Sequence, residues 1–161
     1  MDTKSDNSAQ KDPARKPAAN ATSSSPGAPV DLKKVRVMLV EDQPDTSKMI
    51  KNMLMEIGVT QVYTSPDGQK ALEFMDSADD FIDLIMCDWN MPRVTGIELL
   101  RQLRTAYPNL PFIMVTARGD IESVIVAKEA GVSGFIRKPF SLDELKAKLV
   151  KTMAKAATLP K

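Results

Sequence analysis

Short apolar runs alternate with segments of helical periodicity from Lys33 onward. Five of the runs are rich in β-branched and aliphatic residues, which is typical of strands that are covered on both faces. The predicted strands cover residues 35–40, 61–64, 81–87, 112–115 and 134–136. After each strand, apolar residues recur every three or four positions, which predicts a helix. The predicted helices cover residues 49–57, 68–75, 97–107, 120–130 and 142–153.

Local signals mark the ends of two of these helices. Gly58 follows the first helix, at the position where a glycine commonly ends one. Ser141 and Glu144 form a capping box at the start of the last helix, whose inner face carries an apolar stripe. The stripe consists of Leu142, Leu145, Leu149 and Met153. Because strand and helix alternate five times, we expect an α/β protein with a doubly wound, five-stranded parallel sheet.

The first 29 residues contain no Leu, Ile, Val, Phe, Trp or Tyr. Such a segment cannot bury enough apolar surface to offset the entropy lost when it becomes ordered. We therefore expect a disordered tail over residues 1–32, one domain over residues 33–157 and a short C-terminal tail over residues 158–161. Because only a few residues follow Ala156, we expect no appended output domain.

The composition excludes several kinds of chemistry. The chain has no histidine, which removes Ser-His-Asp and Cys-His catalysis, His-ligated metals and phosphohistidine on this chain. Its only cysteine, Cys87, forms no disulfide within the chain, which favours a reduced, cytoplasmic location. With a net charge of +1 and no arginine-rich run, nucleic-acid binding is not expected. No apolar stretch approaches the roughly 18 residues of a membrane helix, and we expect no secretory signal because the first residues lack an apolar run.

Polar side chains follow four of the predicted strands. Glu41 and Asp42 follow the first strand, and Asp88 follows the third. Thr116 follows the fourth strand and Lys138 the fifth. Because the carboxyl ends of parallel strands meet at one edge, where α/β proteins bind ligands, we expect these five groups to converge.

Carboxylates that converge in this way repel one another. Two charges about 5 Å apart at an effective dielectric near 20 cost roughly 3 kcal/mol. A hard divalent cation would offset this repulsion, and Mg²⁺ fits best because it takes few carboxylates and keeps water and phosphate ligands. A nucleotide cradle is disfavoured, since neither a dinucleotide-binding glycine motif nor a P-loop motif occurs, and the acidic segment 41–44 would repel a bare phosphate.

The order of these residues resembles that of the response-regulator receiver family. The likeness covers about Lys34 to Lys155. It rests on the motifs at residues 37–42, 87–92, 114–117 and 138–140, together with Gly96. The stretch from Asp88 to Pro92 is particularly similar to single-domain, chemotaxis-type regulators.

The resemblance implies a flavodoxin-like strand order of 2-1-3-4-5 and a role for each site residue. Asp88 is expected to be the nucleophile and phosphoacceptor, modified to 4-aspartylphosphate. Lys138 would pair with the phosphoryl oxygens, and Thr116 would hydrogen-bond one of them. The Lys138–Pro139 peptide is cis in the family. The expected Mg²⁺ ligands are Glu41, Asp42, Asp88 and the backbone carbonyl of Asn90.

The resemblance also implies a switch and a set of partners. Movement of Thr116 toward the phosphoryl group would vacate space for Phe135, which alters the surface of the fourth helix, fifth strand and fifth helix. The donor would be a sensor histidine kinase or a phosphotransfer protein, and an unidentified output protein would read the altered surface. The chain is expected to catalyse only its own phosphorylation and dephosphorylation, and so not to be an enzyme.

Two other functions stay open at this point. A phosphatase with Asp88 as a turnover nucleophile would need an acid/base Asp two residues on, where this chain has Asn90. A scaffold that never takes phosphate would not need the full set of acidic, lysine and threonine residues.

Some residues have no role assigned by this scheme. Trp89 either gates the site or simply packs, and the methionines at 49, 53 and 55 are expected in the core. In the family the lifetime of the phosphorylated form depends partly on the residues two past Asp88 and Thr116, here Asn90 and Arg118. The last helix carries a basic outer face, which either attracts an acidic partner or is only solvated.

Overall fold

A computed structural model describes residues 29–78 and 80–159. Most of the predicted N-terminal tail, and the end of the predicted C-terminal tail, lie outside these residues. Leu32 is buried and begins a short 3₁₀ turn, η2 (Leu32–Lys34), whose Asp31 cap accepts a hydrogen bond from the Lys33 amide. Leu32 and Val30, which lie within the expected tail, therefore pack against the core of the folded domain.

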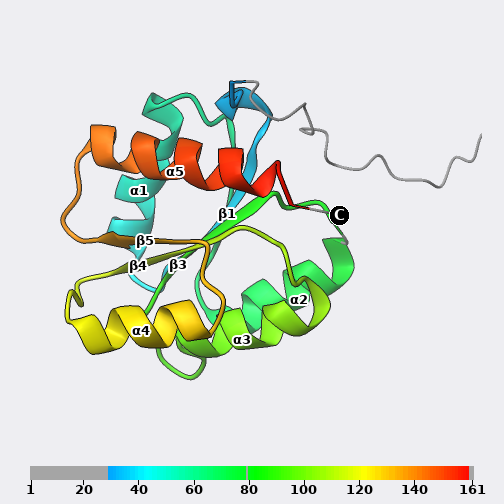
Figure 1. The fold of residues 1–161 in the computed structure, drawn as a ribbon, viewed down its shortest axis with the longest axis vertical. Helices are drawn as coiled ribbons and strands as arrows, with labels where there is room; N and C mark the ends of the chain where they lie inside the picture. Colours follow the sequence, from blue (N-terminus) through cyan, green and yellow to red (C-terminus); the bar gives the residue numbers. More distant parts are fainter. Residues whose placement is uncertain (1–28, 79, 160–161) are drawn as a thin grey trace, which may run out of the picture.

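The described residues form one parallel sheet with helices on both of its faces. The strand order is β2-β1-β3-β4-β5, which confirms the predicted doubly wound topology. The strands are β1 (Arg36–Val40), β2 (Gln61–Ser65), β3 (Leu84–Asp88), β4 (Phe112–Thr116) and β5 (Gly134–Arg137). The helices are α1 (Pro44–Glu56), α2 (Gly68–Ala78), α3 (Gly96–Ala106), α4 (Ile121–Glu129) and α5 (Leu142–Ala156). Helices α1 and α5 cover one face, and α2, α3 and α4 cover the other (Figure 1).

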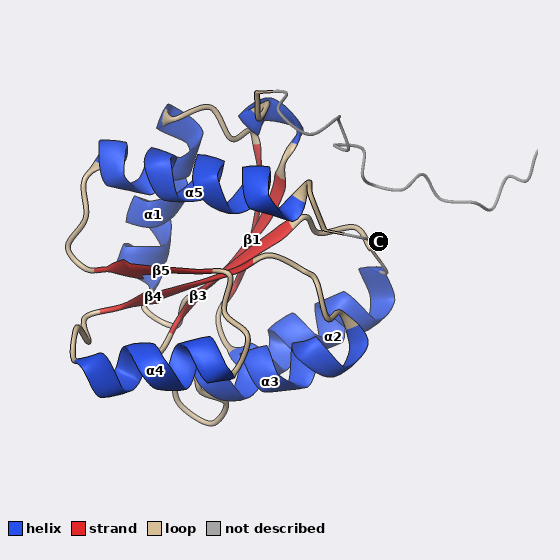
Figure 2. Cartoon of the chain, viewed as in Figure 1, coloured by secondary structure: helices blue, strands red, loops and turns tan. Residues whose placement is uncertain are grey.

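Two apolar cores lie on either side of the sheet, which forms the middle layer in Figure 2. Along β1, Val37 and Leu39 belong to the core under α1 and α5, whereas Met38 and Val40 belong to the core above α2 and α3. Because successive side chains of a strand point to opposite faces, a strand buried on both sides must be apolar throughout. Burial on both faces therefore explains the continuous apolar runs in the sequence.

The third strand begins later than the sequence pattern predicts. The apolar run suggested a strand from residue 81, but β3 starts at Leu84. Phe81 instead packs edge-on against Tyr63, with ring centroids 5.1 Å apart. Asp83 binds the side chain of Arg36 through both of its carboxylate oxygens and accepts the Arg36 amide at 2.8 Å. The Asp83 amide also donates to the Arg36 carbonyl at 2.9 Å, so backbone and side-chain contacts of Asp83 together hold this segment against the start of β1.

The helix ends follow the local signals in the sequence. Gly58, just past α1, has a φ of +117°, a conformation that other residues rarely adopt. Ser141 caps α5 with the predicted capping box, and Thr95 caps α3 with another. Among residues 29–78 and 80–159, none of the helices combines the length and apolarity needed to cross a membrane.

Candidate functional site

Four strands deliver polar side chains to the same edge of the sheet. Glu41 and Asp42 follow β1, and Asp88 is the last residue of β3. Oxygens of these three carboxylates all lie within 4.8 Å of one another. Thr116 ends β4, and Lys138 directly follows β5. The predicted convergence is therefore confirmed for the three acids and, as the next contacts show, for Lys138.

Lys138 brings a positive charge to this acidic cluster. Its Nζ lies 3.3 Å from Asp88 Oδ1 and 3.4 Å from Glu41 Oε1, and it donates a hydrogen bond to each. The Lys138 amide donates to the Thr116 carbonyl at 2.8 Å, which ties the end of β5 to the end of β4. The Lys138–Pro139 peptide is cis. Among the described residues, no other cation forms an ion pair with Glu41, Asp42 or Asp88.

Burial raises the pKa of two of the carboxyl groups. For Asp88 the main cause is loss of solvent, which disfavours the charged form, while the Lys138 ammonium acts in the opposite direction. Burial also raises the pKa of Glu41, with the Asp88 charge adding to the effect. Burial likewise raises the pKa of the neighbouring Cys87 thiol well above its usual value. Cys87 is therefore a protonated core residue and not a nucleophile.

The donor set at this edge fits a hard divalent cation. Three carboxylates face a single ammonium group, so the cluster is short of positive charge. Its ligand atoms are all oxygens, which suit Mg²⁺ and disfavour softer metals. Glu41, Asp42 and Asp88 are the residues that would hold the ion.

The loop after β3 is packed closely against the site. A side chain at Gly96 would collide with the backbone carbonyl of Asp88, and the Gly96 amide donates to the Trp89 carbonyl at 2.9 Å. Arg93, in the same loop, has a φ of +68° and forms an ion pair with Asp67 at 3.6 Å. Asn90, two residues after Asp88 in the chain, is exposed at the start of this loop. The Gly96 amide thus ties the end of the loop to its beginning, and the Arg93–Asp67 ion pair adds a contact from its middle.

The predicted switch residues lie on neighbouring strands, Thr116 at the end of β4 and Phe135 within β5, and they have different partners. Thr116 is fully buried, and its hydroxyl oxygen accepts the Arg118 amide at 2.9 Å. Phe135 is half-buried on β5 and meets Trp89 edge-on, with ring centroids 6.4 Å apart. The Arg118 guanidinium lies over the Trp89 ring, 5.3 Å from its centroid. The sequence singled out Arg118 and Trp89 separately, but it gave no signal for this contact.

Comparison with known proteins fits this geometry. Residues 37–150 match the family model described as the response regulator receiver domain. The chain belongs to this family. The receiver domain is 38% identical to the chemotaxis protein CheY of Pseudomonas aeruginosa over 119 residues, which span 73% of this chain and 94% of that protein. It is 36% identical to CheY-3 of Vibrio cholerae over 121 residues, which span 74% of this chain and 92% of that protein.

Solved structures show the same likeness for the receiver domain. CheY4 of Vibrio cholerae superposes with a TM-score of 0.68 at 30% identity, covering 73% of this chain and 98% of that one. A receiver domain protein of Clostridium thermocellum superposes with a TM-score of 0.69 at 24% identity, covering 75% of this chain and 95% of that one. The second likeness shows the fold alone. The expected family and the expected fold are both confirmed.

Proposed function

We propose that this receiver domain accepts a phosphoryl group onto Asp88 and then presents an altered face to an output protein. The donor is the phosphohistidine of a sensor histidine kinase or a phosphotransfer protein. The observation that supports this most directly is the meeting of three carboxylates and the Lys138 ammonium at one edge of the sheet. In this proposal Glu41, Asp42, Asp88 and the backbone carbonyl of Asn90 hold Mg²⁺.

The chemical step needs few groups. An oxygen of the ionised Asp88 carboxylate attacks phosphorus, so that a P–O bond forms while the P–N bond to the donor imidazole breaks. Lys138 Nζ, 3.3 Å from Asp88 Oδ1, is placed to pair with a phosphoryl oxygen as negative charge spreads over it. A bound Mg²⁺ supplies further neutralisation of that charge. Asp88 needs no general base, because its carboxylate is already a nucleophile.

The signal in this proposal passes from Thr116 to Phe135. The Thr116 hydroxyl turns toward the phosphoryl oxygen, and Phe135 moves into the space that it leaves. Phe135 lies on β5, the edge strand next to β4. Helices α4 and α5 lie on the two sides of β5 (Figure 1). Phosphorylation therefore changes the face formed by α4, β5 and α5, which we call the output face.

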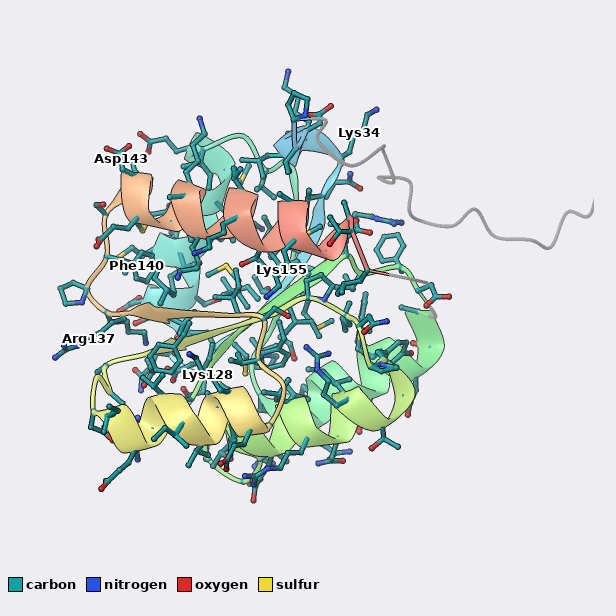
Figure 3. The ribbon with its side chains drawn as sticks, viewed as in Figure 1. Lys34, Lys128, Arg137, Phe140, Asp143 and Lys155 are labelled. Carbon is teal, nitrogen blue, oxygen red and sulfur yellow. The ribbon has the colours of Figure 1, made fainter. Side chains whose placement is uncertain are left out.

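The exposed side chains of the output face support a protein partner. Ile121 and Ile125, four positions apart on α4, are 73% and 47% exposed. Arg137 lies at the sheet edge between α4 and α5 (Figure 3). Helix α5 adds Lys151, which lines a groove between β5 and α5, and Lys155, and both are exposed. This combination favours a partner segment that carries both apolar and acidic side chains.

Related proteins extend the proposal. The relatives named as chemotaxis proteins CheY are matched over 92% and 94% of their lengths. We therefore propose that this chain acts as a chemotaxis-type regulator, working in the cytoplasm as a single receiver domain. It is not an enzyme with an external substrate, because Asp88 is itself the group modified.

Phosphorylation by acetyl phosphate tests the proposal. With Mg²⁺ present, we expect intact-mass spectrometry to show one added phosphoryl group per chain. Asp88→Asn should abolish the addition, whereas Asp76→Asn, which changes an exposed acid on α2, should leave it unchanged. Continuous release of phosphate without labelled protein would instead indicate a phosphatase. If the protein is not labelled and no phosphate is released, only the scaffold function remains.

A further inference from the structure

Arg118 connects three parts of the molecule that the proposed switch involves. It lies in the loop between β4 and α4. Its backbone amide donates to the Thr116 hydroxyl oxygen at 2.9 Å. Its guanidinium lies 5.3 Å from the centroid of the Trp89 ring, and its Nη1 donates to Ser123 Oγ at 3.5 Å. One residue therefore contacts the switch hydroxyl, the indole next to Asp88 and the first turn of α4.

Each of these partners is fixed by further contacts. Trp89 is only 8% exposed, its amide donates to the Val115 carbonyl, and its ring meets Phe135 edge-on. Ser123 is 5% exposed and binds both carboxylate oxygens of Asp120, at 2.9 Å and 3.0 Å. The guanidinium thus joins two largely buried side chains, Trp89 beside the phosphoacceptor and Ser123 at the start of α4.

These contacts oppose the movement that the switch requires. If Thr116 moves toward a phosphoryl group on Asp88, its bond to the Arg118 amide lengthens unless the loop follows. The loop is held in place, because the guanidinium stays bound to Trp89 and Ser123. If these contacts are broken when the switch moves, they shift the equilibrium toward the conformation described here, which we take as the resting one.

We propose that Arg118 is a positioning residue that latches the resting conformation of the β4–α4 loop through its contact with Trp89. The inference rests on the proposed function and names a regulator of the same site. Removing the latch should favour the phosphoryl-bound conformation. A cation over an aromatic ring at an exposed site corresponds to about a two- to fivefold change in an equilibrium constant.

Beryllofluoride, which mimics the phosphoryl group, provides the test on the full chain. Trp89 is the only tryptophan, so its fluorescence reports binding at the neighbouring Asp88. With Mg²⁺ present, we expect Arg118→Gln to bind beryllofluoride about threefold more tightly than the wild type. Arg118→Lys, which keeps the charge, should fall between the two. Arg101→Gln makes the same charge change on an exposed face of α3 and should bind as the wild type does.

A second measurement separates the latch from a general effect of charge. In a Trp89→Leu background, calorimetry should show that Arg118→Gln no longer changes the beryllofluoride affinity. Weaker binding by Arg118→Gln would mean that the guanidinium holds the phosphoryl group, and unchanged binding would mean that it is only a surface contact. Either result overturns the latch. Failure of the wild type to bind beryllofluoride would instead contradict the proposed function.

Discussion

Asp88 is kept in a setting that disfavours its charged form. Its side chain is nearly buried and shares the site with Glu41 and Asp42, and burial raises its pKa above the ordinary value. Lys138 offsets this effect only in part. A phosphoacceptor must nevertheless be ionised, so the fold tolerates a local cost for the sake of reactivity. The cost of burying the ionised Asp88 carboxylate should also lower the free energy of unfolding, which can be measured.

Asp88→Asn should raise the melting temperature of the metal-free protein at neutral pH. Because the folded pKa of Asp88 is raised, the folded state holds more protons than the unfolded state between the two pKa values. Stability of the wild type therefore rises as the pH falls through that window, and the advantage of the variant should shrink there. Calorimetry with a chelator at several pH values measures both effects. A variant that melts below the wild type at neutral pH would contradict this account.

Single elements depend on their caps as much as on their apolar faces. Helix α5 buries Leu145, Leu149 and Thr152, and it begins where Ser141 Oγ accepts the Glu144 amide at 3.1 Å. The Glu144 carboxylate in turn accepts the Ser141 amide at 2.8 Å. Because α5 forms part of the output face, the stability of its first turn affects that face.

Ser141→Ala should lower the free energy of unfolding by about 1 kcal/mol, since it leaves an amide of the first turn without its acceptor. Urea denaturation measures the change. Ser141→Asp is the matched control, because its carboxylate can accept the same amide and suits the helix N-terminus. Equal loss in both variants would show that the hydroxyl acts in some way other than as a cap.

At the scale of the whole molecule, metal binding and folding are coupled. The acidic cluster joins the ends of β1 and β3 and contacts Lys138 after β5, so a ligand there binds only the folded chain. Any such ligand stabilises the fold by mass action. The effect is independent of phosphorylation and can be measured alone.

Mg²⁺ at ten times its dissociation constant should stabilise the fold by about 1.4 kcal/mol, and a chelator should reverse the shift. The melting temperature with and without Mg²⁺ is the measurement. Asp42→Asn should lose most of the shift, whereas Asp76→Asn, far from the cluster on α2, should keep it. An equal shift in all three proteins would show that the ion binds elsewhere.

The sequence by itself determined the order of the elements. It also determined that helices cover both faces of the sheet and that an acidic cluster lies at one edge. Hydrophobic periodicity is a local signal that each segment carries in full, so β1 was recognisable from its own apolar run. The site followed from a topological rule, because parallel strands place Glu41, Asp88 and Lys138 at one edge wherever the loops go. Sequence reasoning needed no side-chain geometry for either conclusion.

Only the tertiary structure decided which side chains of an element are buried and which residues from different segments contact one another. Met49 and Met55, expected in the core, are about half exposed, at 53% and 51%, because α1 turns them away from the sheet. The late start of β3 and the Arg118 guanidinium over Trp89 are further cases. Such contacts join residues far apart in the chain, and they depend on the path of the loops and on side-chain rotamers. Periodicity along one segment carries no information about either.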